Sequence, residues 1–271
     1  MGKVIVITSG KGGVGKTTAT ANLGAGLALA GKSVVLIDTD IGLRNLDLVL
    51  GLENRIVFDL VDVVDGRCRS FRQALIKDKR FDNLHILASA QSRDKDAVKP
   101  EQMKALCTEL KQAFDYILLD CPAGIEMGFK NAIAGADEAV VVTNPEVSAV
   151  RDADRIVGLL EAAEMQSIGL ILNRVKPGLI KRGQMLSVDD VQDILNLKLL
   201  GMVPEDERIV HASNKGEPAV LDRASKAGEA YRDIVMRLLD PGRPMMATHG
   251  DEGIWSKLRR LLTVNLGSQA S

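Results

Sequence analysis

The sequence has few aromatic residues and almost no net charge. Phe, Trp and Tyr make up 3% of its 271 residues and hydrophobic residues 46%, so we predict a core of mainly aliphatic side chains. The formal net charge of −1 provides no overall positive field that would attract nucleic acid. Any anionic partner must therefore bind to a local cluster of basic residues.

Long apolar runs are also missing from the sequence. No window approaches the roughly 20 apolar residues needed to cross a membrane. Lys3 leads directly into the first apolar run, so we expect no secretory signal. A myristoylation signal beginning at Gly2 needs Ser or Thr where the chain has Val6. We therefore predict a protein of the cytoplasm.

Cysteine is scarce and scattered. Cys68, Cys107 and Cys121 form no C-x-x-C pair and show no metal-binding spacing with the three histidines. Such a set is typical of reduced thiols in the cytosol. We predict that Cys121 serves in packing.

The most informative segment is a glycine-rich loop between a predicted strand at residues 4–8 and a predicted helix at residues 19–30. It matches G-x-x-x-x-G-K-[ST] completely, which predicts a P-loop that binds a nucleoside triphosphate. The glycines allow successive backbone N–H groups to face the phosphates, and the helix N-terminus adds positive potential. Lys16 is predicted to reach the β- and γ-phosphates, and the Thr17 hydroxyl to bind Mg²⁺. The loop comprises Gly10, Lys11, Gly12, Gly13, Val14, Gly15, Lys16, Thr17 and Thr18.

Aspartates follow two other predicted strands. Asp38 ends the strand at residues 33–38 and is followed by Asp40, whereas Asp120 ends the strand at residues 116–120. Carboxylates at the carboxyl ends of parallel strands share the sheet edge where ligands bind. Phosphoryl transfer requires acids that hold the metal and orient the attacking water. The run ending in Asp120 is typical of a Walker B strand, so we predict that Asp120 meets Mg²⁺ through water.

With its second lysine, Lys11, the glycine loop resembles the deviant Walker A motif of the SIMIBI class of ATPases. The resemblance implies an ATP-bound homodimer in which Lys11 reaches the partner subunit's site, so that Lys11 and Lys16 both act in catalysis. It also implies that Asp38 lies near Mg²⁺ and that Asp40 orients the attacking water. The D-x-P-x-G segment resembles the switch II of this family, in which the Gly124 N–H could sense the γ-phosphate.

A base-recognition segment is expected after the predicted strand at residues 167–172. A GTPase would show N-K-x-D there, but the chain has Asn173 followed by Arg174, Val175 and Lys176. This segment is similar to the ATPase pattern of the family, which places Asn173 on the adenine edge. The cofactors implied are ATP and Mg²⁺.

Alternating strand and helix patterns predict a single α/β domain over residues 1–239. We expect about seven mostly parallel strands flanked by helices. The remaining predicted strands are at residues 84–87, 138–143 and 197–203. Helices are predicted from residue 100 and at 148–164, 188–195, 209–231 and 232–239, with short helices within 57–73 and a loop at 175–187. His85 alternates with apolar neighbours and is predicted to be structural.

The C-terminal part divides into a predicted linker at 240–252, an amphipathic helix at 253–266 and a tail at 267–271. Five apolar residues fall within an arc of about 100° on this helix, and three cations lie outside it. A basic amphipathic helix with an interfacial Trp is typical of a membrane-surface anchor, and two copies in a dimer would bind anionic lipid better than one. A helix docked on its own domain or on a partner is the alternative. Asn265 interrupts the apolar face, so the end of the anchor stays open. The predicted membrane-binding residues are Ile254, Trp255, Lys257, Leu258, Arg259, Arg260, Leu261 and Leu262.

Motif and tail together are similar to the members of this ATPase family that select the site of cell division on the inner membrane. This resemblance implies two protein partners, a division inhibitor and a stimulator of hydrolysis, which dock near Arg151, Asp152 and Asp154. A DNA-partitioning ATPase of the ParA type is the alternative, which the near-zero net charge and the lipid-type tail disfavour. An iron–sulfur carrier would need cysteines that bridge a cluster, and Cys121 has no evident cysteine partner.

Overall fold

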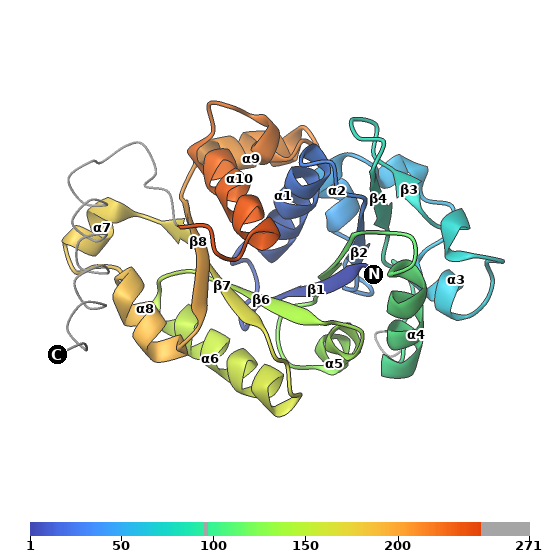
Figure 1. Ribbon diagram of the computed structural model, residues 1–271, viewed down its shortest axis with the longest axis horizontal. Coiled ribbons are helices and arrows are strands. Elements are labelled where there is room, and N and C mark those ends of the chain that lie inside the picture. Colours follow the sequence, from blue (N-terminus) through green and yellow to red (C-terminus); the bar gives the residue numbers. More distant parts are fainter. Residues whose placement is uncertain (95–96, 245–271) are drawn as a thin grey trace.

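The computed structural model describes residues 1–94 and 97–244. Within these residues, one eight-stranded sheet in the order β3-β4-β2-β5-β1-β6-β7-β8 carries helices on both faces (Figure 1). Seven strands are parallel, as predicted, and β3 alone is antiparallel to its neighbour β4. The strands are β1 (Lys3–Thr8), β2 (Val34–Asp38), β3 (Ile76–Lys77), β4 (Leu84–Leu87), β5 (Tyr116–Asp120), β6 (Glu138–Thr143), β7 (Ile168–Val175) and β8 (Lys198–Pro204).

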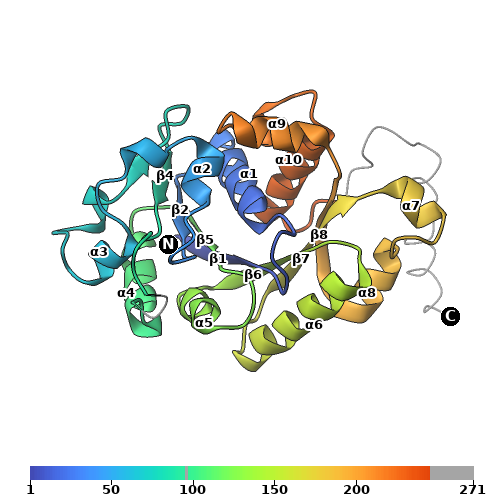
Figure 2. The same cartoon turned by 180° about the vertical axis from the view of Figure 1, so that it is seen from behind.

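Two helical layers bury the two faces of the sheet in separate aliphatic cores. One layer contains α1, α2, α9 and α10, and the other contains α4, α5, α6 and α8 (Figures 1 and 2). The mainly aliphatic core agrees with the prediction from composition. The helices are α1 (Lys16–Leu29), α2 (Leu46–Leu50), α3 (Leu60–Val64), α4 (Pro100–Leu110), α5 (Met127–Ala134), α6 (Val147–Ala162), α7 (Pro177–Lys181), α8 (Val188–Leu195), α9 (Glu207–Asn214) and α10 (Lys226–Leu239).

Several predicted boundaries were wrong. Helix α1 begins at Lys16, so the P-loop lysine already belongs to the helix. The predicted loop at 175–187 contains α7, which starts on Pro177, a residue well suited to a first helical turn. The predicted helix at 209–231 is broken into α9, a short 3₁₀ turn and α10, because Gly216 adopts a φ of 65° and Pro218 follows it. The prediction also missed α2, α5 and the two-residue strand β3.

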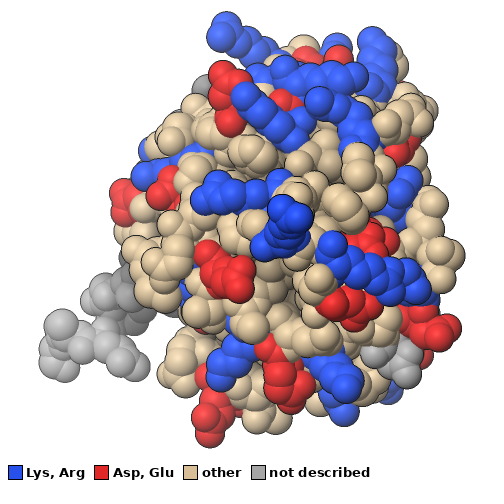
Figure 3. Space-filling view, turned by 90° about the vertical axis from the view of Figure 1, so that its right-hand side faces the viewer, with Lys and Arg blue, Asp and Glu red and all other residues tan. Residues whose placement is uncertain are grey.

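The β3 edge of the sheet is rich in basic side chains. Figure 3 views this side of the molecule and shows Lys and Arg gathered over its upper part. Lys77 of β3 is exposed, and lysine on an edge strand discourages pairing with another chain. His85 of the neighbouring β4 packs edge-on against Phe114, with ring centroids 5.5 Å apart, and burial lowers the pKa of its imidazole. These contacts fit the structural role predicted for His85.

The domain continues a few residues past α10. Lys198 Nζ donates a hydrogen bond to the Pro241 carbonyl at 3.0 Å, which holds the start of the predicted linker on β8. The predicted amphipathic helix at 253–266, with Trp255, and the tail at 267–271 lie outside the described residues. In the described part of the chain, no helix is long and apolar enough to span a bilayer.

Candidate nucleotide-binding site

The predicted P-loop connects β1 to the N-terminus of α1. Gly13 and Gly15 have φ values of 77° and 98°, which side chains rarely permit. Gly15 is the N-cap of α1, and a Cβ added to it would lie 2.2 Å from Asn173 Nδ2. The loop thus has the backbone curl and the helix terminus that the motif predicted.

The P-loop also lies directly on α6. A Cβ added to Gly10 would lie 2.1 Å from the backbone oxygen of Asp152. Lys11 extends toward the start of α6, where its Nζ donates to Ser148 Oγ at 3.2 Å and lies 4.0 Å from Glu146 Oε2. In the single chain, Lys11 is therefore held on α6.

Asp38 and Asp120 lie side by side, because they are paired in register on β2 and β5. The Asp38 carboxylate accepts backbone hydrogen bonds from Asp40 at 2.9 Å, Asn45 at 3.0 Å and Leu46 at 3.1 Å. Burial and the neighbouring Asp120 raise the pKa of Asp38 to about 7. Asp38 therefore shapes the segment that follows β2 in addition to its predicted role near the metal.

Asp120 is held by α1. The Thr20 hydroxyl donates to Asp120 Oδ1 at 3.1 Å, and Thr20 is fully buried. Burial raises the pKa of Asp120, whereas Lys16 and hydrogen bonds from Thr17 and Thr20 oppose this rise. The prediction missed Thr20, although its position one helical turn after Lys16 placed it on the same side of α1.

Two adjacent buried carboxylates and a threonine hydroxyl form a suitable donor set for Mg²⁺. Hard divalent cations prefer oxygen ligands, and Mg²⁺ usually keeps several of its waters. Burial raises the pKa of both aspartates, repulsion from Asp120 adds to the rise at Asp38, and a bound cation would favour the charged form of each carboxylate. Thr17, Asp38 and Asp120 thus fit the predicted metal site.

The segments after β2 and β5 are joined to each other and to the P-loop. Thr39 donates to the Asp120 carbonyl from its backbone N–H at 3.0 Å and from its Oγ1 at 2.8 Å. Gly124, with a φ of 92°, donates its N–H to the Ser9 carbonyl at 3.3 Å. Asp40 lines a cavity of about 150 Å³ together with Phe129 of α5. These hydrogen bonds join the segment after β2 to Asp120 and the segment after β5 to Ser9, which precedes the P-loop.

A larger cavity of about 600 Å³ opens beside the P-loop. Asn173 lies on its wall and donates its Nδ2 to the Val14 carbonyl at 2.6 Å, so the predicted base-reading residue does adjoin the loop. The prediction missed most of the other wall residues, which come from β7, the β8–α9 connection and α10. The cavity is lined by Gly15, Thr18, Asn173, Arg174, Pro204, Glu205, Asp206, Glu207, Ile209, Val210 and Tyr231.

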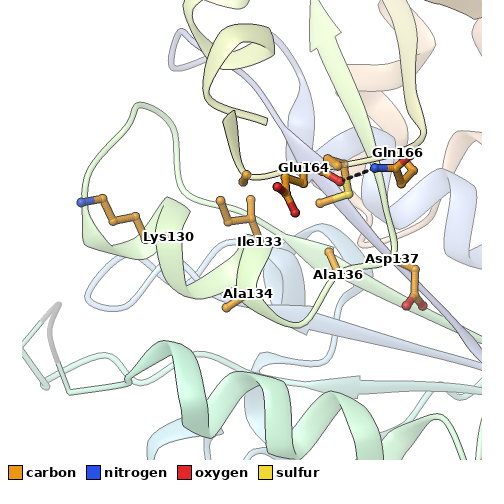
Figure 4. A pocket seen from close by; sticks show the side chains of 9 residues that line it. Lys130, Ile133, Ala134, Ala136, Asp137, Glu164 and Gln166 are labelled. Atoms are coloured by element: carbon orange, nitrogen blue, oxygen red, sulfur yellow. Dashed lines mark hydrogen bonds between the residues drawn. The ribbon is translucent and has the colours of Figure 1, made fainter. Parts of the chain in front are cut away.

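Another cavity, of about 400 Å³, lies between the end of α5 and the end of α6. Figure 4 shows Lys130 pointing away from it and Gln166 bonded to the backbone oxygen of Glu164. No residue predicted for the site lines this cavity.

Cys121 is fully buried, as its predicted packing role requires. Burial raises the pKa of its thiol to about 12. A thiol kept protonated is a poor metal ligand, because the thiolate is the form that binds metals. This environment weighs against the iron–sulfur alternative.

A curled phosphate loop at a helix terminus, with strand-end aspartates beside it, defines a P-loop nucleotide hydrolase. Residues 5–219 match the CobQ/CobB/MinD/ParA nucleotide-binding domain. The septum site-determining protein MinD of Bacillus subtilis is 54% identical over 267 residues, covering 97% of this chain and 99% of that protein. The chain belongs to the MinD family of septum site-determining ATPases.

Solved structures agree with this assignment. The MinC:MinD cell division protein complex of Aquifex aeolicus matches with a TM-score of 0.84 at 49% identity, covering 91% of this chain and 99% of that one. MinD of Pyrococcus horikoshii, complexed with Mg-ADP, matches with a TM-score of 0.81 at 33% identity, covering 89% of this chain and 97% of that one.

Proposed function

We propose that this division-site ATPase works as an ATP-controlled membrane switch. ATP binding would produce a homodimer, and two C-terminal helices would then hold the cytoplasmic face of the inner membrane. Hydrolysis would return the monomer to the cytoplasm. The observation that carries the proposal is the pairing of Asp38 with Asp120, because two adjacent carboxylates at the strand ends support a Mg²⁺-dependent hydrolase.

Each site residue has a proposed role in this cycle. The amides of the P-loop and Lys16 bind the phosphates, and Asn173 contacts the adenine edge. Thr17, Asp38 and Asp120 would hold Mg²⁺, the two aspartates through water. The bound Mg²⁺ would neutralise charge on the phosphates. Asp40 orients the attacking water. The Gly124 N–H, which donates to the Ser9 carbonyl in this structure, would respond to the γ-phosphate.

Lys11 is proposed to act across the dimer. It must leave Ser148 and Glu146 on α6 to reach a partner's phosphates. Its side chain is 45% exposed, so its contacts with α6 are screened by solvent and weak. The same movement would change the start of α6, which the P-loop contacts at Gly10.

The proposed partners are MinC, MinE and anionic lipid. The Aquifex relative was solved as a MinC:MinD complex, which supports MinC as a partner here. On α6, Arg151 and Asp154 are exposed and Asp152 adjoins the P-loop, so a protein docked there would contact a nucleotide-responsive surface. MinE is the proposed stimulator of hydrolysis. The membrane contact is assigned to the predicted helix containing Trp255.

Sedimentation with anionic vesicles in ATP, in ADP and without nucleotide tests the switch. The full chain should sediment in ATP only, and a chain ending before Ile254 should stay soluble while it still binds ATP. The Asp40→Ala variant should bind ATP and remain on the vesicles, because slow hydrolysis traps the dimer. Sedimentation that survives the truncation would assign the membrane contact to another segment, and sedimentation without nucleotide would contradict the switch.

A ParA-type DNA-partitioning function receives no comparable support. A ParA family ATPase of Chlorobium tepidum shares 22% sequence identity with this chain, which is a likeness of fold alone. Retention on DNA without vesicle binding would favour this alternative.

A further inference from the structure

Arg174 has an unusual backbone conformation for its place in the fold. Among the described residues, three that are not glycine have a positive φ: Glu164 at 58°, Arg174 at 54° and Asn196 at 49°. Glu164 follows the end of α6 and Asn196 is the C-cap of α8, positions where left-handed residues commonly end a helix. Arg174 lies inside strand β7, where no helix end explains the conformation.

An irregularity in the sheet directs the Arg174 side chain outward. The pairing of β7 with β8 shifts between Leu172 and Val175 and resumes where Val175 faces Pro204. Between these pairs β7 has one residue more than β8, which is a β-bulge. A β-bulge redirects a side chain and is frequent beside active sites. Asn173 and Val175 are buried, whereas Arg174 is exposed and lines the 600 Å³ cavity. The left-handed conformation therefore positions a guanidinium group at this cavity.

The acidic side chains of the cavity wall do not explain the position of Arg174. Asp206 already accepts hydrogen bonds from the Arg208 N–H, the Ser225 hydroxyl and the Ala227 N–H. Within residues 1–94 and 97–244, no ion pair joins Arg174 to Glu205, Asp206 or Glu207. The guanidinium is thus available to a ligand.

Arg174 of β7 and Tyr231 of α10 line the same cavity. Burial raises the pKa of the Tyr231 phenol, and the positive charge of Arg174 opposes this rise. The shared cavity wall and this electrostatic effect are consistent with a guanidinium that faces the cavity from β7. A flat group entering between the P-loop and α10 would meet the guanidinium.

We propose that Arg174 binds the base of the nucleotide by stacking its planar guanidinium on the purine ring. Arginine stacks on aromatic faces and lysine does not do so equivalently. Strained backbone conformations persist at ligand-binding positions because the surrounding structure maintains them. The inference rests on the proposed function, which places the adenine in this cavity beside Asn173.

The test compares two probes, Mg·ATP and inorganic triphosphate, by calorimetric titration of the full chain. Arg174→Gly removes the guanidinium and allows the positive φ without strain. We expect it to weaken ATP binding about tenfold, to change triphosphate binding less than about twofold, and to leave the melting temperature equal or higher. Arg174→Lys keeps the positive charge but lacks the planar guanidinium. It should therefore also bind ATP several-fold more weakly than the unmodified protein does.

Glu164→Gly is the matched control, because it relieves the same backbone conformation at the separate cavity of Figure 4. Both affinities should stay at the level of the unmodified protein. Unchanged ATP affinity in Arg174→Gly would overturn the inference, as would an equal loss for ATP and triphosphate, since that would place Arg174 on the phosphates. A loss of affinity that accompanies a lower melting temperature would assign Arg174 a purely structural role. If the unmodified protein bound ATP no better than triphosphate, the result would contradict the proposal that this cavity binds the base.

Discussion

The two ends of the nucleotide site are built in different ways. The phosphate end consists of residues 10–18 with Asp38 and Asp120, which are brought together by one loop and two neighbouring strands. The proposed base end is the wall of the 600 Å³ cavity, which comes from β7, the β8–α9 connection and α10. The phosphate end depends on backbone geometry that only glycine permits, whereas the base end depends on side chains from distant segments.

This difference predicts which changes are severe. At the phosphate end, small changes collide with backbone or remove a charge that faces the phosphates. At the proposed base end, the cavity wall is shared among several residues from different elements, so the loss of one contact to the base should be partial. Four variants, from the largest expected effect to the smallest, test this contrast.

Lys16→Ala should have the largest effect, because it removes the cation at the phosphate end. Losing a charge-assisted contact to phosphate should weaken Mg·ATP binding by about 100-fold or more and prevent ATP-dependent dimers. Titration calorimetry and size-exclusion chromatography with ATP measure both outcomes. Lys104→Ala, on the exposed side of α4, is the control and should bind normally. ATP-dependent dimers of the Lys16 variant would contradict the assignment of the P-loop.

Gly10→Ala should destabilise the protein without any nucleotide present. The added Cβ would lie 2.1 Å from the Asp152 oxygen, so the loop and α6 must move apart. Overpacking of this kind costs about 1–3 kcal/mol in the free energy of unfolding. Urea unfolding measures the difference against Gly12→Ala, where a Cβ has nothing within 4 Å. Equal stability of the two variants would show that the loop is not held on α6.

Thr20→Val should weaken the binding of Mg²⁺ more than it lowers the stability of the fold. The variant keeps the shape of the side chain but leaves Asp120 without its 3.1 Å hydrogen bond. We expect the Mg²⁺ concentration that supports ATP binding to rise about tenfold, because the carboxylate loses its orientation. Thr20→Ser restores the hydroxyl and should restore the Mg²⁺ dependence. If the serine variant behaves like the valine variant, packing rather than the hydroxyl is responsible.

Asp206→Asn should give the smallest effect, at the base end. Burial raises the pKa of Asp206, but hydrogen bonds from Ser225, Arg208 and Ala227 outweigh burial and hold it below its usual range. The charged form therefore stabilises the folded state above the unfolded pKa of about 4, and this contribution is lost as the pH falls through the lower folded pKa.

The substitution should lower the free energy of unfolding by about 1 kcal/mol at pH 7, because Asp206 caps the first turn of α9 and also binds the start of α10. Urea unfolding at several pH values should show the difference between the variant and the unmodified protein shrinking below about pH 4. A difference that does not depend on pH would mean that the carboxylate charge is unimportant.

The sequence alone determined the fold class and the phosphate end. The P-loop is contiguous, and its conformation depends on glycines whose φ values other residues avoid, so the motif carries its own geometry. Alternating strands and helices allow few topologies, which explains why the parallel sheet and the edge shared by Asp38 and Asp120 were predicted correctly.

Only the tertiary structure decided the base end and the direction of several side chains. Lys11 donates a hydrogen bond to Ser148, and Asp38 accepts hydrogen bonds from the backbone of the segment that follows it. Arg174 lies at a shift in sheet pairing and lines the same cavity as Tyr231. Each of these arrangements joins residues that lie on different elements or depends on a local register change. Periodicity and motif spacing describe the chain along its length, whereas packing decides which distant side chains meet.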